Sequence, residues 1–228
     1  MKLVLSCMDR RLNEYLDSLN DGNTIFLRNA GANLYAVRNT IDSLLNDENI
    51  TEIRVITHTD CGAMKSVAAA LSGELKLDLA REVLVDKFRG EKFATVEELE
   101  RINTELQKKA VEEIAKRRGI KGSAELLDLS KLNIPKEDKE HKFILLEPSS
   151  KKYKEIIGNG EMFNTYIIQS ASLEEKLSDL EIAIRVLGIK RGEIIALKES
   201  EYRITQAEAS RLRLNQLLNG VALSIRRL

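Results

Sequence analysis

Residues that bind metals or form disulfides are scarce in this chain, and neither sign of charge is in excess. Two cysteines and two histidines are all that its 228 residues contain. Two thiols in a chain of this length exclude a disulfide framework, so a reducing, cytoplasmic location is expected. Lysine plus arginine number 36, as do aspartate plus glutamate. This balance gives no electrostatic basis for binding nucleic acid or an anionic membrane.

Long apolar runs are also missing. No run approaches the roughly 18 residues of a membrane span. The first predicted strand begins at Lys2, which leaves no room for a signal peptide. We therefore expect neither a membrane nor a nucleic acid as a partner. The apolar share of 43% is nevertheless enough for a sizeable core, in one large domain or two small ones.

Short apolar runs alternate with stretches of helical spacing in the first part of the chain. The apolar runs predict strands at residues 2–5, 24–27 and 53–56, with an edge strand at 125–132. Helical spacing predicts helices at 34–45, 61–71 and 96–118, the last between a capping box of Thr95 and Glu98 and a stop at Gly119. Strands that alternate with helices indicate an α/β fold with a parallel sheet, in which ligands bind at the carboxyl ends of the strands.

The same order of elements recurs later in the chain. Strands are predicted at 142–146, 164–168 and 193–197, and helices from a capping box at Ser172 to Gly188 and from Thr205 onward. One shift of 140 relates the halves, as Leu5 and Leu145 illustrate. Any two strand–helix–strand stretches look somewhat alike, but the shared shift favours a degenerate tandem duplication. We divide the chain into residues 1–140 (the first half) and 141–228 (the second half), with a linker at 135–141.

Three of the four cysteines and histidines lie in two short blocks, Cys7-Met8-Asp9-Arg10-Arg11 and His58-Thr59-Asp60-Cys61-Gly62. Sulfur and imidazole are the ligands that Zn²⁺ prefers, and three protein ligands leave a fourth position for water. The pattern predicts a catalytic zinc site on Cys7, His58 and Cys61, although each cysteine alone could be a buried apolar residue. At the shift of 140 these ligands fall on Glu147, Lys198 and Glu201, so the second half is expected to hold no metal and to use these residues in ion pairs.

Asp9 and Arg11 stand next to the first predicted ligand. A carboxylate at Asp9 could orient a zinc-bound hydroxide, and Arg11 could keep it ionised through a bidentate pair. Such a site suits attack on a small electrophilic carbon, whereas a surface ion pair of little consequence is the alternative. Asp60 is expected to cap the helix that follows it. His141 is expected to be a solvated side chain in the linker.

The two blocks resemble those of the β-class carbonic anhydrases, which carry Cys-x-Asp-x-Arg after the first strand and His-x-x-Cys further along. The stretch Arg28-Asn29-Ala30-Gly31 is similar to the family's Asn-Ala-Gly segment. The resemblance implies the β-carbonic-anhydrase fold, zinc on the three predicted ligands, and Asp9 with Arg11 as a catalytic dyad. It also implies a zinc-dependent lyase that reversibly hydrates carbon dioxide to bicarbonate through zinc-bound hydroxide.

Two departures from the family pattern affect the prediction. Arg10 stands where the first block usually has serine, which adds charge near the site. The second departure is the tandem arrangement. The family forms dimers with the active site near the interface, so this arrangement predicts an internal pseudo-dimer whose second half lines the cleft, and it leaves further homo-oligomers open.

Two alternative functions remain open. The same scaffold also serves hydrolases of carbonyl sulfide or carbon disulfide, and a non-catalytic zinc-binding homologue is a third interpretation.

Overall fold

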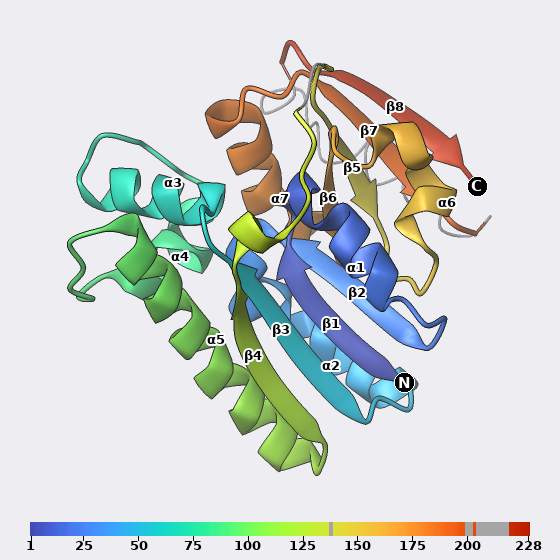
Figure 1. The fold of residues 1–228 in the computed structure, drawn as a ribbon, viewed down its shortest axis with the longest axis horizontal. Helices are drawn as coiled ribbons and strands as arrows, with labels where there is room; N and C mark the ends of the chain where they lie inside the picture. Colours follow the sequence, from blue (N-terminus) through green and yellow to red (C-terminus); the bar gives the residue numbers. More distant parts are fainter. Residues whose placement is uncertain (137–138, 199–202, 204–218) are drawn as a thin grey trace.

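The protein is described by a computed structural model that covers residues 1–136, 139–198, 203 and 219–228 (Figure 1). Its described strands form one eight-stranded sheet in the order β4-β3-β1-β2-β6-β5-β7-β8. Neighbouring strands are parallel within each half, and β2 pairs with β6 in antiparallel fashion. The predicted α/β fold with a mostly parallel sheet is therefore confirmed. The strands are β1 (Lys2–Cys7), β2 (Thr24–Asn29), β3 (Glu52–His58), β4 (Lys121–Leu127), β5 (Lys142–Leu146), β6 (Thr165–Gln169), β7 (Arg191–Ala196) and β8 (Ala222–Arg227).

The central strands carry apolar side chains on both faces, and helices cover the sheet on both sides to bury them. Leu3 and Leu5 of β1 pack toward α2 and α5, whereas Val4 packs toward α1. Figure 1 shows α1 in front of the sheet and α2 behind it. The α-helices are α1 (Asn13–Leu19), α2 (Arg38–Asp47), α3 (Gly62–Leu71), α4 (Ala80–Val83), α5 (Val96–Arg118), α6 (Tyr153–Ile157) and α7 (Leu173–Glu181).

The long helix α5 has the bounds that the sequence predicts. The Thr95 hydroxyl accepts a hydrogen bond from the Glu98 backbone N–H at 3.3 Å, and Gly119 ends the helix with a φ of 68°. A glycine on β4 lets the helix lie directly on the sheet. A Cβ atom at Gly122 would lie 2.6 Å from the Ala115 Cβ and 2.8 Å from the Val111 carbonyl oxygen. Nearer its start, α5 lies beside the end of β3, where the hydroxyl oxygens of Thr104 and Thr57 are 2.7 Å apart.

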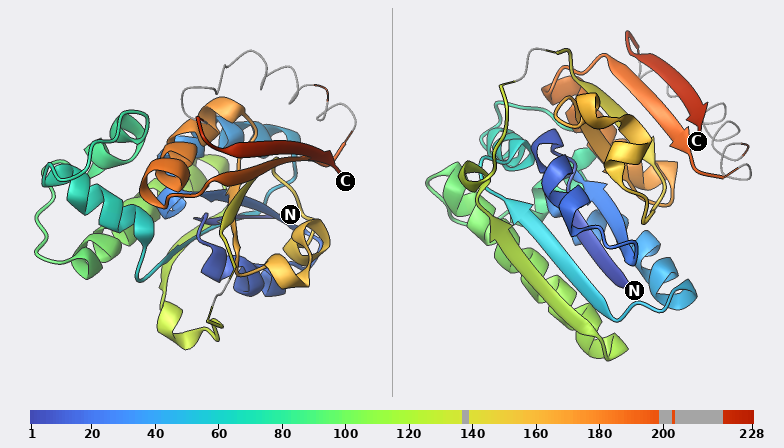
Figure 2. Two further views of the ribbon diagram at one scale, coloured as in Figure 1. Left: turned by 90° about the horizontal axis from the view of Figure 1, so that it is seen from above. Right: turned by 45° about the vertical axis from the view of Figure 1, so that its right-hand side comes forward.

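The strand order is symmetric about the junction of β2 and β6, with β4 and β8 at the two opposite edges (Figure 2). This order is consistent with the tandem duplication and the pseudo-dimer, which remain interpretations. The single shift of 140 is wrong in detail because the connecting segments differ in length. Pairing with the neighbouring strands matches Thr24 to Thr165, a shift of 141, and Ile53 to Gly192, a shift of 139. At the latter shift His58 matches Leu197 and not Lys198.

Other differences from the predicted elements are local. The predicted helix at 34–45 begins as the 3₁₀ turn Leu34–Val37 before α2, and α7 continues into the π-helical turn Ile182–Val186. The edge strand β4 lies four residues earlier than predicted, and β8 was not predicted. The helix predicted from Thr205 lies outside the described residues. In the described part of the chain, no helix is both long and apolar enough to cross a membrane.

Candidate metal centre

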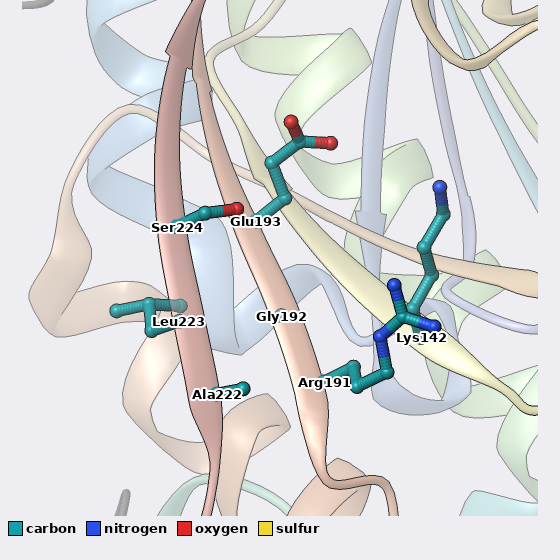
Figure 3. A pocket seen from close by; sticks show the side chains of 7 residues that line it. All are labelled: Lys142, Arg191, Gly192, Glu193, Ala222, Leu223 and Ser224. Carbon is teal, nitrogen blue, oxygen red and sulfur yellow. The ribbon is translucent and has the colours of Figure 1, made fainter.

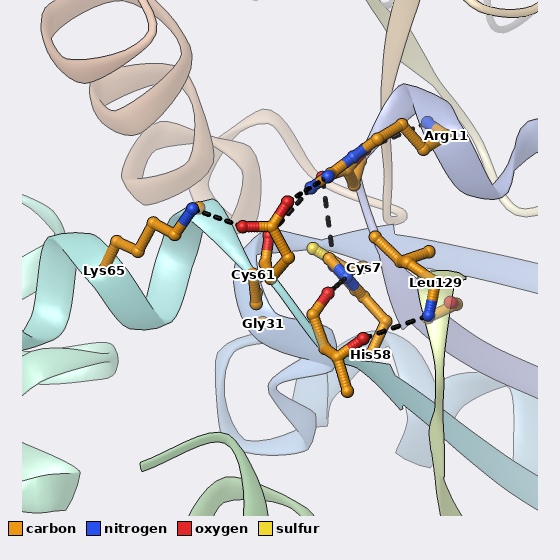
Figure 4. A network of polar contacts seen from close by, with 12 residues as sticks. Cys7, Arg11, Gly31, His58, Cys61, Lys65 and Leu129 are labelled. Carbon is orange, nitrogen blue, oxygen red and sulfur yellow. Dashed lines mark hydrogen bonds and ion pairs between the residues drawn. The ribbon is translucent and has the colours of Figure 1, made fainter. Parts of the chain in front are cut away.

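The three predicted metal ligands meet at the carboxyl edge of the sheet. Cys7 is the last residue of β1, His58 is the last residue of β3, and Cys61 immediately precedes α3. Their ligand atoms all lie within 4.8 Å of one another, and the three residues are only 1–3% exposed (Figure 4). The parallel arrangement of β1 and β3 produces this meeting, since neighbouring parallel strands end at the same edge.

The ring of His58 is oriented by the backbone beside it. Its Nδ1 atom lies 2.8 Å from the Thr59 carbonyl oxygen, which fixes Nε2 as the free ring nitrogen. Nε2 is buried and has no hydrogen-bond partner among the described residues. An orphaned buried nitrogen beside two cysteine sulfurs fits the donor set of a tetrahedral divalent metal with one open position. The residues present therefore fit a zinc ion.

The two cysteines influence each other's ionisation. A hydrogen bond from the Cys61 thiol holds the pKa of Cys7 well below its usual value. The same bond, together with burial, raises the pKa of Cys61 well above its usual value. The hydrogen bond between the two sulfurs thus favours a state in which one of the two cysteines is a thiolate. Thiolates, not thiols, are the metal-binding form of cysteine.

Asp9 and Arg11 form a bidentate pair at the edge of the ligand cluster. Arg11 Nε donates to Asp9 Oδ1 at 3.0 Å and Arg11 Nη2 donates to Asp9 Oδ2 at 2.7 Å, while the Arg11 backbone N–H adds a bond of 2.9 Å. Burial opposes ionisation, but these bonds outweigh it and lower the pKa of Asp9 to about 2. Asp9 Oδ2 lies 4.0 Å from His58 Nε2. The carboxylate is therefore ionised at neutral pH and adjacent to the metal-binding atoms.

The prediction that Asp60 caps α3 is wrong. No described side chain caps the start of α3. Asp60 has a φ of 56°, and its carboxylate forms ion pairs with Arg11 and Lys65. The hydrogen bond from the Lys65 ammonium makes the largest contribution to lowering the pKa of Asp60. The N–H group of Cys61, at the start of α3, instead donates to Glu100 Oε1 at 2.7 Å. Glu100 comes from α5, is 2% exposed, and was not predicted from the sequence.

A fully buried arginine binds the backbone of the first motif block, residues 7–11. Arg28, which is 0% exposed, donates to the Cys7 carbonyl at 2.6 Å, to the Asp9 carbonyl at 2.8 Å and to Asn13 Oδ1 at 2.9 Å. Its guanidinium also lies 5.3 Å from the centre of the Tyr153 ring, a residue of the second half. These bonds fix the backbone from Cys7 to Asp9, which carries a metal ligand and the acidic residue.

A cavity of about 300 Å³ opens onto this cluster. Three of its lining residues, Tyr166, Ile182 and Leu187, belong to the second half. No sequence signal marks these three residues, because their place depends on the antiparallel junction of β2 and β6. The other lining residues come from the first half: Cys7, Met8, Asp9, Arg11, Asp60, Gly62, Ala63 and Lys65. The site is thus enclosed by both halves of the chain.

Two further residues differ from their expected settings. His141 is half-buried, and its ring packs against Tyr166 with 5.6 Å between ring centres, so the expectation of a solvated side chain is wrong. Arg10 donates to the Phe163 carbonyl at 2.7 Å. The arginine that departs from the family pattern therefore links the first block to the second half instead of lining the cavity.

The second half arranges the matching positions differently. Glu147, which follows β5 as Cys7 ends β1, pairs with Lys176 at 3.4 Å, and Lys176 Nζ also donates to the Ser170 carbonyl at 2.6 Å. Lys198 has interactions as well, but Glu201 lies outside the described residues. The buried ammonium of Lys176, 3% exposed, thus supplies a positive charge beside the residue that matches Cys7.

A larger cavity, of about 410 Å³, lies against β5, β7 and β8 (Figure 3). Its charged lining residues already have partners: Lys142 pairs with Glu161 at 3.5 Å and Glu193 with Arg226 at 2.7 Å. Neither cysteine nor histidine is among its described lining residues, which are Lys142, Arg191, Gly192, Glu193, Ala222, Leu223 and Ser224. The smaller cavity at the metal centre is therefore the candidate functional site.

Comparisons with known proteins identify the family. A family model described as carbonic anhydrase matches residues 2–134, more than half of the chain. The crystal structure of the β-carbonic anhydrase CafA of Aspergillus fumigatus is similar at 21% identity, over 57% of this chain and 71% of that one, with a TM-score of 0.39. A carbonic anhydrase from Glaciozyma antarctica is similar at 23% identity, over 57% and 77% of the two chains, with a TM-score of 0.37. No curated protein matches the chain. The family match confirms the resemblance of the two motif blocks: the chain belongs to the carbonic anhydrase family.

Proposed function

We propose that this protein is a zinc-dependent carbonic anhydrase that reversibly hydrates carbon dioxide to bicarbonate. The observation that carries the proposal is the cluster of Cys7, His58 and Cys61, whose ligand atoms lie within 4.8 Å of one another beside an ionised Asp9. In this proposal residues 1–140 hold the zinc and residues 141–228 form a metal-free half that completes the cleft as an internal pseudo-dimer.

Zinc held by two thiolates and one imidazole supplies Lewis-acid chemistry that turns water into a nucleophile near neutral pH. Asp9 directs that nucleophile. An ionised carboxylate can only accept hydrogen bonds, so Asp9 would accept a hydrogen bond from a hydroxyl group held beside it and would thereby orient that group toward the cavity. Because the pKa of Asp9 is about 2, the residue does not change its role across the neutral range.

Arg11 keeps Asp9 in place. Its side chain binds both carboxylate oxygens and also donates to the Asp60 carbonyl oxygen at 2.8 Å, so the guanidinium is held from two directions. A carboxylate whose oxygens are both engaged is kept from turning toward the metal-binding atoms. Arg11 thus holds Asp9 as a hydrogen-bond acceptor beside the metal and stops it from taking the open position.

The cavity suits a small apolar substrate and an anionic product. Ile182 and Leu187 from the second half, with Ala63, give an apolar wall for carbon dioxide. Arg11 and Lys65 lie on the same lining, where each is paired with the carboxylate of Asp9 or Asp60. They offer N–H donors to bicarbonate next to the apolar wall.

Metal analysis combined with a hydration assay tests the proposal. We expect one zinc ion per chain and carbon dioxide hydration that rises with pH and is lost in Cys61→Ser. Asp9→Asn is expected to keep the zinc and to lose most of the rate, about 100-fold, because the amide can donate a hydrogen bond and no longer fixes the hydroxyl. The control Lys2→Met removes an exposed ion pair with Asp21 and is expected to change neither property.

The outcomes separate the alternatives. Bound zinc with release of hydrogen sulfide from carbonyl sulfide, but poor hydration of carbon dioxide, identifies the hydrolase. Zinc without either activity identifies a non-catalytic zinc-binding homologue. Purified protein that binds no zinc contradicts all three, and unimpaired turnover in Asp9→Asn contradicts the role of the Asp9–Arg11 pair.

A further inference from the structure

The second half contributes a buried acidic residue next to the metal centre. Asp179, on α7, is 2% exposed, and its Oδ1 atom accepts a hydrogen bond from the Ala30 backbone N–H at 2.8 Å. Asp179 does not line the described cavity, so it is not placed to contact a substrate. Besides a Coulombic interaction with Cys7, it can act on the site through the segment that it holds.

That segment, residues 29–31, contacts both blocks that carry the thiols. The Asn29 carbonyl accepts a bond from the N–H of Met8, the residue after Cys7, at 2.9 Å. A Cβ atom at Gly31 would lie 3.0 Å from the Met64 Cε, within the first turn of the helix that follows Cys61. Residues 29–31 therefore lie against both cysteine-bearing stretches, with a hydrogen bond on the Cys7 side and side-chain packing on the Cys61 side.

Burying the carboxyl group of Asp179 at this place costs free energy. Its Oδ2 atom is buried and has no hydrogen-bond partner within the described part of the chain. Burial raises the pKa of Asp179 to about 8, so the side chain tends toward the neutral acid. A buried acid with an unsatisfied oxygen lowers stability, which makes a purely structural role for it unfavourable.

The second half offers an internal comparison. At the matching place, Thr40 Oγ1 on α2 accepts a bond from the Ala171 backbone N–H, also at 2.8 Å. Each half thus holds the end of the other half's strand through a helix side chain. The two bonds have equal length, but the one at Ala171 has no cysteine near it in the sequence. The pair therefore separates an effect on the interface from an effect on the metal centre.

We infer that Asp179 is a positioning residue of the metal centre: from the second half it fixes Ala30, and through residues 29–31 it sets the relative placement of Cys7 and Cys61. The inference rests on the proposed zinc function. It assigns to the second half a direct part in metal binding, beyond enclosing the cavity. Asp179→Leu removes the acceptor, and Asp179→Asn retains an oxygen that can accept the Ala30 N–H. Thr40→Val removes the matching bond at Ala171 together with the bond that the Thr40 hydroxyl donates to Glu175.

Zinc affinity of the full-length protein, measured by competition with a chromophoric chelator, tests the inference. Loss of a residue that supports metal ligands costs about 10- to 100-fold in metal affinity. We expect that loss in Asp179→Leu, recovery to nearly the wild-type affinity in Asp179→Asn, and no loss in Thr40→Val. The cobalt-substituted proteins give a second readout, since the thiolate-to-cobalt absorption of Asp179→Leu should differ from that of the other three proteins.

The outcomes distinguish this inference from the proposed function. Wild-type protein that binds no zinc overturns the proposed function itself. Wild-type protein that binds zinc, with equal affinity in Asp179→Leu and Thr40→Val, overturns the positioning role alone. Should Asp179→Leu fail to fold, Asp179→Ser replaces it, because serine is too short to reach Ala30; equal zinc affinity in the serine and asparagine variants then overturns the inference.

Discussion

Replacement of Arg28 is the most informative perturbation of this fold, because one buried side chain binds the backbone of both the metal ligand Cys7 and the acidic residue Asp9. Arg28→Met removes all three hydrogen bonds of the guanidinium, to the carbonyls of Cys7 and Asp9 and to Asn13 Oδ1. Arg28→Gln is the milder substitution, because it removes fewer hydrogen bonds. Gln169 occupies the matching position and donates to the Glu147 carbonyl at 2.9 Å, so glutamine can make one of the three bonds.

The expected losses follow from these bonds. A hydrogen bond to a charged group contributes about 1.5–3 kcal/mol, and the low end applies because removing a buried charge also relieves its desolvation cost. Arg28→Gln loses two bonds, which gives a loss of about 3 kcal/mol in the free energy of unfolding. Arg28→Met loses three, which gives about 4–5 kcal/mol. Arg28→Met should also weaken zinc binding, since the carbonyl of the metal ligand Cys7 is released, whereas Arg28→Gln can keep the bond to that carbonyl and should weaken zinc binding less.

Urea unfolding followed by circular dichroism, at a fixed concentration of free zinc, measures these losses. Gln169→Met is the matched control: it removes the bond to the Glu147 carbonyl and the bond that Gln169 Oε1 accepts from the Tyr153 hydroxyl, and it is expected to lower stability while leaving zinc affinity unchanged. Arg28→Met with a free energy of unfolding within about 1 kcal/mol of the wild type, or with unaltered zinc affinity, would refute the reasoning.

Two further predictions concern residues around the metal. The folded-state pKa of Asp9, about 2, lies below its ordinary value of 3.8, so the ion pair stabilises the fold above about pH 4 and this contribution is lost as the pH falls toward 2. From pH 4 to pH 2 the wild type should therefore lose about 2 kcal/mol more than Asp9→Asn in urea unfolding; parallel curves would contradict the pairing. Glu100→Leu leaves the Cys61 N–H without its acceptor and should weaken zinc binding about 10-fold. Glu100→Gln keeps the acceptor and is the control. Equal losses of zinc affinity in the two variants, measured by chelator competition, would show that the bond does not position Cys61.

The residues of the site whose positions can be predicted from the sequence are those at the ends of strands or within one short block. Cys7 and His58 follow apolar runs, and parallel strands bring such residues to one edge, so their proximity needs no long-range information. Asp9 and Arg11 lie within the same block and form a local pair. The helix α5 was predictable because its caps are local signals, Thr95 at one end and a glycine at the other.

The remaining parts depend on contacts between distant segments. Glu100 and Asp179 are acidic residues on amphipathic helices, where such residues are usually solvated, and only the packing of α5 and α7 buries them. Tyr166 reaches the cavity because β2 pairs with β6. Asp60 was misassigned because its left-handed backbone conformation points the carboxylate toward Arg11. Strand β8 was missed because its side chains are only partly buried, as at a sheet edge.

The antiparallel contact of β2 with β6 joins the two walls of the cavity within a single polypeptide. Where two separate chains build such a cleft, dilution takes the walls apart, and catalytic competence then varies with how much enzyme is present. Here Ile182 and Leu187 belong to the same chain as Cys7, with which they line the cavity. The specific rate of this enzyme should therefore stay constant from micromolar stocks down to the most dilute assay.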